Sequence, residues 1–65
     1  SFVKGMAKIV KIVRETPGIT QRELLSRANK KHLCLSHLYF ACHQGHIVEK
    51  RGLFGSRYYP EGYVK

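Results

Sequence analysis

The stretch ITQRELLSRANKKHLCLSHLYFACHQGHIVEKRGLFGSRYYP, Ile19 to Pro60, decides the fold of this chain. At its start, Thr20 and Glu23 have the spacing of a capping box, in which the Thr hydroxyl accepts from an amide in the first turn and the Glu carboxylate accepts from the cap amide. A short helix therefore begins here. It ends at residues 29–31, where an Asn that tolerates left-handed backbone precedes two cations that favour a helix C-terminus. Its apolar residues form one stripe: Leu24, Leu25 and Ala28.

A longer helix is predicted over residues 32–44, with Gly45 as its C-terminal cap. At about 100° per residue, five small or apolar residues fall within one arc of about 120°. They are Cys34, Leu35, Leu38, Ala41 and Cys42. We expect this arc to be buried, with both thiols free, because eight helical residues separate the sulfurs by about 12 Å along the axis. The opposite arc holds His32, Leu33, Ser36, His37, Phe40 and His43.

Regular elements are also predicted on both sides of these two helices. A first amphipathic helix over residues 6–13 is indicated by apolar residues at helical spacing: Met6, Ile9, Val10 and Val13. The sequence Thr-Pro-Gly at 16–18 ends it, because Pro fixes φ and Gly accepts a positive φ. After the third helix, β-branched and aromatic residues predict strands over 46–50 and 56–60, joined by a loop over 52–55.

Length and charge narrow the class of protein. Sixty-five residues allow a single domain, 1–65, with a core over about 6–60 and a short tail, 61–65, whose Tyr63 and Val64 are expected to pack back on it. Twelve Lys and Arg against four Asp and Glu give a net charge of +8, which attracts polyanions. No apolar run reaches the roughly 18 residues of a membrane span, and the lysine-rich start lacks a signal-peptide core. We expect an intracellular chain, in cytoplasm and nucleoid or in a nucleus, with no membrane partner.

Two patterns connect the chain to a known fold. They are Ile19-Thr20-x-x-Glu23-Leu24-Leu25 and Leu38-x-x-Ala41-x-x-x-Gly45-x-Ile47-Val48. With the order helix, capped short helix, longer helix and hairpin, the chain resembles the winged helix-turn-helix domains of bacterial and phage regulators over about residues 6–60. The resemblance implies an α+β fold with three helices and a small antiparallel β-hairpin, the wing, and double-stranded DNA as the partner. Such domains usually carry a larger residue at the position of Ala41. We therefore expect Tyr39 and Cys42 to help fill the core.

The resemblance also implies a set of DNA contacts. His32, Ser36 and His37 on the third helix would face bases in the major groove. Phosphate contacts are expected from Lys30 and Lys31 before that helix, from Thr20, Gln21 and Arg22 at the start of the second helix, and from Lys50, Arg51 and Arg57 around the hairpin loop. One monomer offers a small interface, so we expect a homodimer or a larger parent protein.

Catalysis and metal binding are not supported by the sequence. The spacing Cys34-x2-His37-x4-Cys42-x3-His46 is similar to a zinc-ligand set. On one continuous helix, however, Cys34 lies about 80° around the axis and about 12 Å along it from Cys42, and about 120° around it from His46, so these donors cannot converge on an ion. The four acidic residues are scattered, with no pair spaced for acid and base catalysis. We therefore expect no enzyme activity, metal or cofactor.

Two other functions remain open at this point. Leu33 and Phe40 fall on the outward face of the third helix, where a groove-reading helix is normally polar. Such an exposed pair, with Phe54 of the hairpin loop as a further apolar anchor and the positive charge for an acidic partner, indicates a protein partner. Tyr58 and Tyr59 on the hairpin keep RNA binding open through base stacking.

Overall fold

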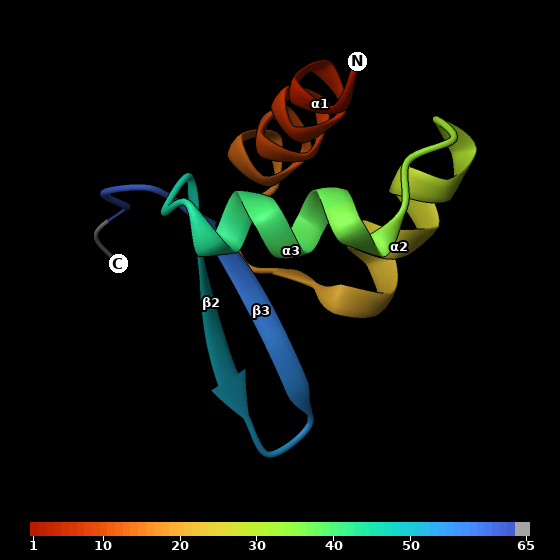
Figure 1. Cartoon of the computed structure of the whole chain (residues 1–65). Coiled ribbons are helices and arrows are strands. Elements are labelled where there is room, and N and C mark those ends of the chain that lie inside the picture. The colour runs from red at the N-terminus through yellow and green to blue at the C-terminus, as the bar shows by residue number, and fades with distance from the viewer. Residues whose placement is uncertain (64–65) are drawn as a thin grey trace.

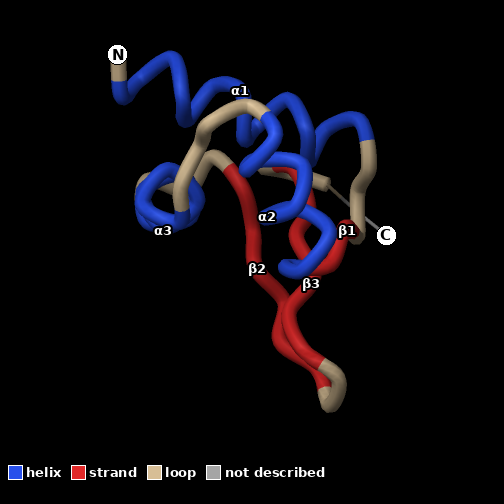
Figure 2. The backbone as a smooth tube through the Cα atoms, turned by 90° about the vertical axis from the view of Figure 1, so that its right-hand side faces the viewer, coloured by secondary structure: helices blue, strands red, loops and turns tan. Residues whose placement is uncertain are grey.

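Three helices and a three-stranded antiparallel sheet make up the computed structural model, which describes residues 1–63 (Figures 1 and 2). The α+β class expected from the sequence is confirmed. In chain order the elements are α1 (Phe2–Glu15), β1 (Ile19–Thr20), α2 (Gln21–Lys30), α3 (Leu35–His43), β2 (Ile47–Gly52) and β3 (Gly55–Pro60). Val64, expected to pack on the core, lies outside the described residues, whereas Tyr63 stacks on Tyr59 with ring centroids 5.3 Å apart.

Helix α1 starts four residues earlier than the pattern of apolar residues predicts, because the Ser1 hydroxyl accepts from the Lys4 amide at 3.3 Å and caps it. Its apolar side is buried against the other elements: Met6, Ile9, Ile12 and Val13. Ile12 takes the buried position that the sequence assigned to Val10, which is only partly covered. The helix ends before Pro17, as predicted.

Helix α2 begins where the capping box predicts. The Thr20 hydroxyl accepts from the Glu23 amide at 3.2 Å. The Glu23 carboxylate accepts instead from Arg27 Nε at 3.1 Å, and Arg27 also donates to the Thr16 hydroxyl at 3.0 Å. Arg27 therefore connects α2 to the end of α1.

Helix α3 begins at Leu35, three residues later than predicted. His32 has φ of 59°, the left-handed region, so the chain leaves α2 through a connection of four residues, 31–34, rather than starting a helix there. Leu38 and Ala41 are buried as expected. The predicted burial of Cys34 and Leu35 is wrong: Cys34 is the exposed N-cap, and Leu35, in the first turn, is 56% exposed.

The sheet has the order β1-β3-β2, so β3 is its central strand. Strand β1 covers only the base of the hairpin, pairing Ile19 with Tyr58 and Thr20 with Arg57. The β2–β3 hairpin then extends away from the helices, as Figures 1 and 2 show. Its strands are longer than predicted, which shortens the turn from 52–55 to Leu53 and Phe54.

The core lies where all three helices meet the base of the hairpin. Its fully buried large side chains are Ile9, Val13, Leu24 and Ile47. Tyr58 is 3% exposed and joins this cluster, while Tyr59 on the opposite face of the sheet is also buried. The two tyrosines, on which the RNA alternative was based, therefore present no free aromatic face for base stacking.

Candidate functional site

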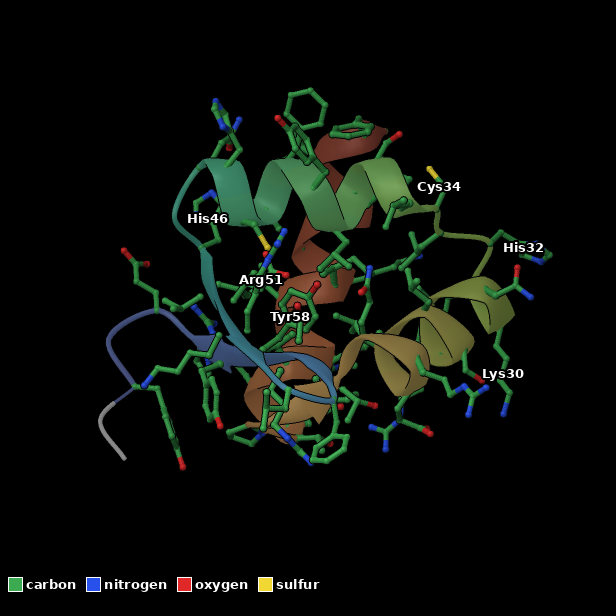
Figure 3. All side chains as sticks on the ribbon, turned by 90° about the horizontal axis from the view of Figure 1, so that it is seen from below. Lys30, His32, Cys34, His46, Arg51 and Tyr58 are labelled. Atoms are coloured by element: carbon green, nitrogen blue, oxygen red, sulfur yellow. The ribbon has the colours of Figure 1, made fainter. Side chains whose placement is uncertain are left out.

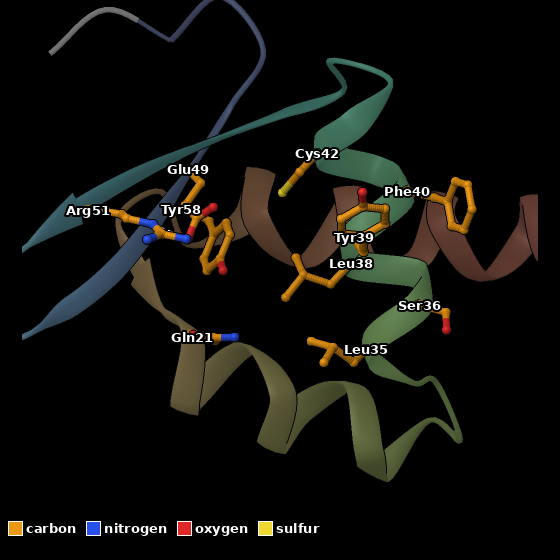
Figure 4. Close-up of a pocket in the computed structure, with 10 residues that line it drawn as sticks. All are labelled: Gln21, Leu35, Ser36, Leu38, Tyr39, Phe40, Cys42, Glu49, Arg51 and Tyr58. Carbon is orange, nitrogen blue, oxygen red and sulfur yellow. Dashed lines mark ion pairs between the residues drawn. The ribbon is translucent and has the colours of Figure 1, made fainter.

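A hollow of about 420 Å³ separates α3 from the hairpin and opens to solvent (Figure 4). Its lining comes from three elements: Gln21 at the start of α2; Leu35, Ser36, Leu38, Tyr39, Phe40 and Cys42 on α3; and Glu49, Arg51 and Tyr58 on the hairpin. In Figure 4 the Leu35, Leu38 and Cys42 side chains lie toward the hairpin, whereas Ser36 and Phe40 point away from it. The floor of the hollow is therefore apolar and its hairpin side is charged.

The solvent-facing side of α3 is apolar and aromatic. Leu35 and Tyr39 are 56% and 62% exposed, and Phe40 is partly exposed. Tyr39 stacks on His43 at 6.0 Å between ring centroids, while Phe40 contacts Phe2 of α1 edge-on at 5.4 Å. Leu33, expected to pair with Phe40 on this face, is half-buried against the core. Phe40 is therefore exposed as expected, but the residues beside it on this face are Leu35 and Tyr39, and the expectation that Tyr39 helps to fill the core is wrong.

His37, which the resemblance predicts to face bases, packs against α1 in the structure. Its ring stacks on Phe2 with centroids 4.5 Å apart, and Nδ1 accepts the Cys34 backbone N–H at 3.1 Å. The imidazole thus completes the cap of α3 and packs between two helices. Ser36 is exposed on the outer side of the first turn, and His32 is exposed in the connection before the helix.

The Cys34 thiol lies beside this cap, 3.3 Å from His37 Nδ1. Hydrogen bonding, above all from the Ser36 backbone, lowers the pKa of Cys34. In contrast, burial raises the pKa of Cys42, and the nearby Glu49 carboxylate adds to that shift. The two thiols are free, as expected, but they differ in environment.

The three hairpin cations lie on two different faces. Lys50 and Arg57 are directly opposed in the register and share the face away from the hollow. Lys50 Nζ lies 5.6 Å from the Tyr59 ring centroid, and Arg57 donates to the Gly18 carbonyl at 2.8 Å. Arg51 is on the hollow side. The three predicted phosphate contacts of the hairpin therefore do not share one face.

The hollow side of the hairpin also carries an acidic group. Glu49 accepts from the Ser56 hydroxyl, and its carboxylate lies 3.8 Å from Arg51 Nε. Burial raises the pKa of Tyr58 to about 12, and Glu49, opposite it in the register, adds to the shift. Glu49 was not among the residues that sequence reasoning placed in a site.

The remaining predicted contacts lie at the two ends of α2. Thr20 caps the helix, Gln21 lines the hollow, and Arg22 is exposed beside them. Lys30 and Lys31 are exposed at the far end. Figure 3, a view from below, places Lys30 and His32 together at one side and Arg51 under the middle of the molecule. The structure thus brings Gln21 and Arg51 together but separates them from Lys30.

Sequence reasoning missed one exposed apolar feature entirely and, in a second, named Phe54 but not Leu53. One is the exposed pair Leu35 and Tyr39 on α3. The available signal was that apolar residues occur on all sides of this helix, so some of them had to be exposed. The other is the hairpin turn, where Leu53 and Phe54 are 97% and 102% exposed. Two large apolar residues between two glycines, in a turn, were the available signal.

Within residues 1–63, no group of three or more His, Cys, Asp or Glu side chains is placed to hold a metal ion. No helix in this described part of the chain is both long enough and apolar enough to cross a membrane. No protein-family model matches the chain, and neither the curated proteins nor the solved structures include one significantly similar to it.

Proposed function

We propose that this chain is a non-enzymatic, double-stranded DNA-binding domain of the winged helix-turn-helix type. The observation that carries the proposal is the exposed side of α3 beside a protruding basic hairpin, in a domain with a net charge of +8. The order of elements, with a two-residue strand before α2 and a four-residue connection between α2 and α3, is compatible with that fold.

In this proposal α3 lies in the major groove and the hairpin lies over the adjacent backbone and minor groove. Ser36, Tyr39 and His43 offer hydrogen-bonding groups on the exposed side of α3, and Leu35 offers an apolar contact of the kind that a thymine methyl group accepts. His32 stands before the first turn of α3, at the end of the helix that enters the groove in this geometry.

Phosphate contacts would come from groups around this helix. Arg51 and Lys50 on the hairpin, and Arg22 at the start of α2, are exposed cations, and Lys30 and Lys31 extend the charge beyond the start of α3. Arg57 keeps guanidinium donors beyond the one that bonds to Gly18. Each phosphate neutralised contributes about −0.9 to the slope of log affinity against log salt concentration.

The test is a fluorescence anisotropy titration with a mixed-sequence duplex at several salt concentrations. The variant K50E/R51E reverses two hairpin charges, and K4E/K8E reverses two exposed charges on α1, so both variants lose the same net charge. We expect K50E/R51E to weaken binding strongly and to make the salt slope shallower by about 2, with K4E/K8E close to wild type. Equal losses in the two variants, or none, would contradict the proposed interface.

A second function, docking of a protein segment, is favoured by one observation. Leu35 and Tyr39 are more than half exposed at the rim of a mostly apolar hollow. A partner with apolar anchors and acidic flanks would fit a groove edged by Arg51. Chemical-shift mapping with a duplex distinguishes the two: shifts in α3 together with the hairpin support DNA, whereas shifts confined to the apolar residues of α3, without the hairpin, favour the protein partner.

A further inference from the structure

The turn of the β2–β3 hairpin is the most exposed apolar feature of the molecule. Leu53 and Phe54 are 97% and 102% exposed, so neither side chain is covered by any other residue in the described range 1–63. They occupy the turn at the extremity of the hairpin, far from the helices (Figure 1). Single exposed apolar residues are common on proteins, but two adjacent large ones with no intramolecular cover call for a contact outside the chain.

The conformation of the turn does not require these two residues. Gly, Asn, Asp and Ser are the residues that such turns favour. Leu53 and Phe54 both have negative φ, and the positive φ of the turn, 118°, belongs to Gly55. A polar residue at 53 or 54 would therefore serve the backbone equally well. Neither folding nor turn geometry accounts for the apolar side chains.

Cations stand immediately behind the apolar tip. Arg51 and Lys50 precede it, and Arg57 follows it, while the one acidic side chain nearby, Glu49, is engaged by Ser56 and by Arg51. A partner that binds both the apolar tip and the cations behind it must present anionic groups at its surface and an apolar gap just beneath them. Stacked base pairs below two rows of phosphates have this arrangement.

We propose that Leu53 and Phe54 form a wedge that inserts between base pairs from the minor groove and bends the duplex, an inference that rests on the proposed DNA binding. The minor groove is about 6 Å wide. Two strands about 4.8 Å apart, with their side chains, are too broad to enter it at depth. Insertion of Phe54 unstacks one base step, widens the groove and turns the helix axis toward the major groove.

The sequence preference of this wedge follows from the mechanics of DNA. Pyrimidine–purine steps such as TA and CA unstack at least cost. A flexible step under the hairpin tip therefore strengthens binding without any hydrogen bond to its bases.

A bilayer would be contacted by the tip alone, whereas a duplex at the tip also brings phosphates toward Gln21 and Arg22.

The experiment compares binding and bending on one duplex, labelled at its ends for energy transfer and carrying 2-aminopurine at a central TA step. The variant L53S/F54S removes the wedge. The control, V3S, makes a similar apolar-to-polar change on α1, where Val3 is 68% exposed. Circular dichroism verifies that each variant is folded. Anionic phosphatidylserine vesicles are tested in parallel by co-sedimentation.

We expect wild type and V3S to bend the duplex by at least about 20° and to raise 2-aminopurine fluorescence. L53S/F54S should bind about tenfold more weakly, with an unchanged salt slope and no bend. Binding without a bend, or a bend that L53S/F54S retains, would overturn the wedge while leaving DNA binding in place. Failure of wild type to bind any duplex would instead contradict the proposed function itself. Vesicle binding that depends on residues 53 and 54, with no duplex bending, would overturn the wedge in favour of a lipid surface.

Discussion

Gly5 of α1 and His37 of α3 occupy adjoining space: a β-carbon built on Gly5 overlaps the imidazole Cδ2 of His37. The absence of a side chain at residue 5 therefore allows the two helices to approach at this point. Because the same imidazole stacks on Phe2 and caps α3 through the Cys34 amide, it has little freedom to move aside.

The first prediction concerns this close approach. G5A should destabilise the protein by about 1–2 kcal/mol, because the cost of overpacking, about 1–3 kcal/mol, exceeds the gain of up to about 1 kcal/mol in helix propensity. In an H37A background, where the ring is absent, G5A should stabilise the protein. Urea denaturation of the four proteins measures both effects, and the same sign in both backgrounds would disprove the contact.

Thr20 provides a second test, because its hydroxyl caps α2. T20A should lower the free energy of unfolding by about 1 kcal/mol, the usual cost of losing an N-cap hydroxyl. T20S keeps the hydroxyl and should recover most of the loss. S26A, an exposed change in the middle of the same helix, serves as the control and is expected to be neutral or slightly stabilising. Thermal melts followed by circular dichroism measure all three.

Tyr58 makes stability depend on alkaline pH. Burial raises its pKa in the folded state to about 12 from an ordinary value of 10.0, so the folded state favours the neutral phenol. The resulting stabilisation is complete below pH 10 and is lost as the pH rises through about 12. Chemical denaturation across this range should show a steep decline in wild type. Y58F has no phenol to ionise at this position and should decline less; equal declines would contradict the assignment.

The two cysteines should react at different rates. Cys34 is exposed and its pKa is lowered, whereas the pKa of the half-buried Cys42 is raised. Since the thiolate is the reacting species, iodoacetamide should modify Cys34 first in the folded protein, and the difference should disappear in denaturant. Peptide mass spectrometry at successive times and pH values resolves the two sites. Faster modification of Cys42 would show that α3 is packed differently.

The start of α2 could be predicted to the residue because capping is local chemistry between Thr20 and Glu23. The start of α3 could not. It depends on a left-handed His32, a conformation rare outside glycine, and on the Leu33 amide, which donates to the Ala28 carbonyl at 2.9 Å and turns the chain. The spacing of apolar residues alone predicted residues 32–34 as the first part of a continuous helix.

The positions of the candidate DNA contacts could also be predicted only in part from the sequence. Helical angles correctly group His37 with Ser36 on one side of α3, but they do not tell which part of that side meets α1, and the gap at Gly5 decides it. The alternation of side chains along β2 would have separated Lys50 from Arg51 at the sequence level. Proximity to one loop instead groups Lys50, Arg51 and Arg57 as its cations and does not separate them by face.

The brevity of β1 has a mechanical consequence. Its second residue is also the cap of α2, so the sheet and the helix share Thr20 as a single joint. Any tilt at the base of the hairpin is therefore transmitted to the first turn of α2. Within residues 1–63, no third strand lies beside the hairpin between Arg57 and the turn, so this outer half can bend under load while the base keeps its orientation.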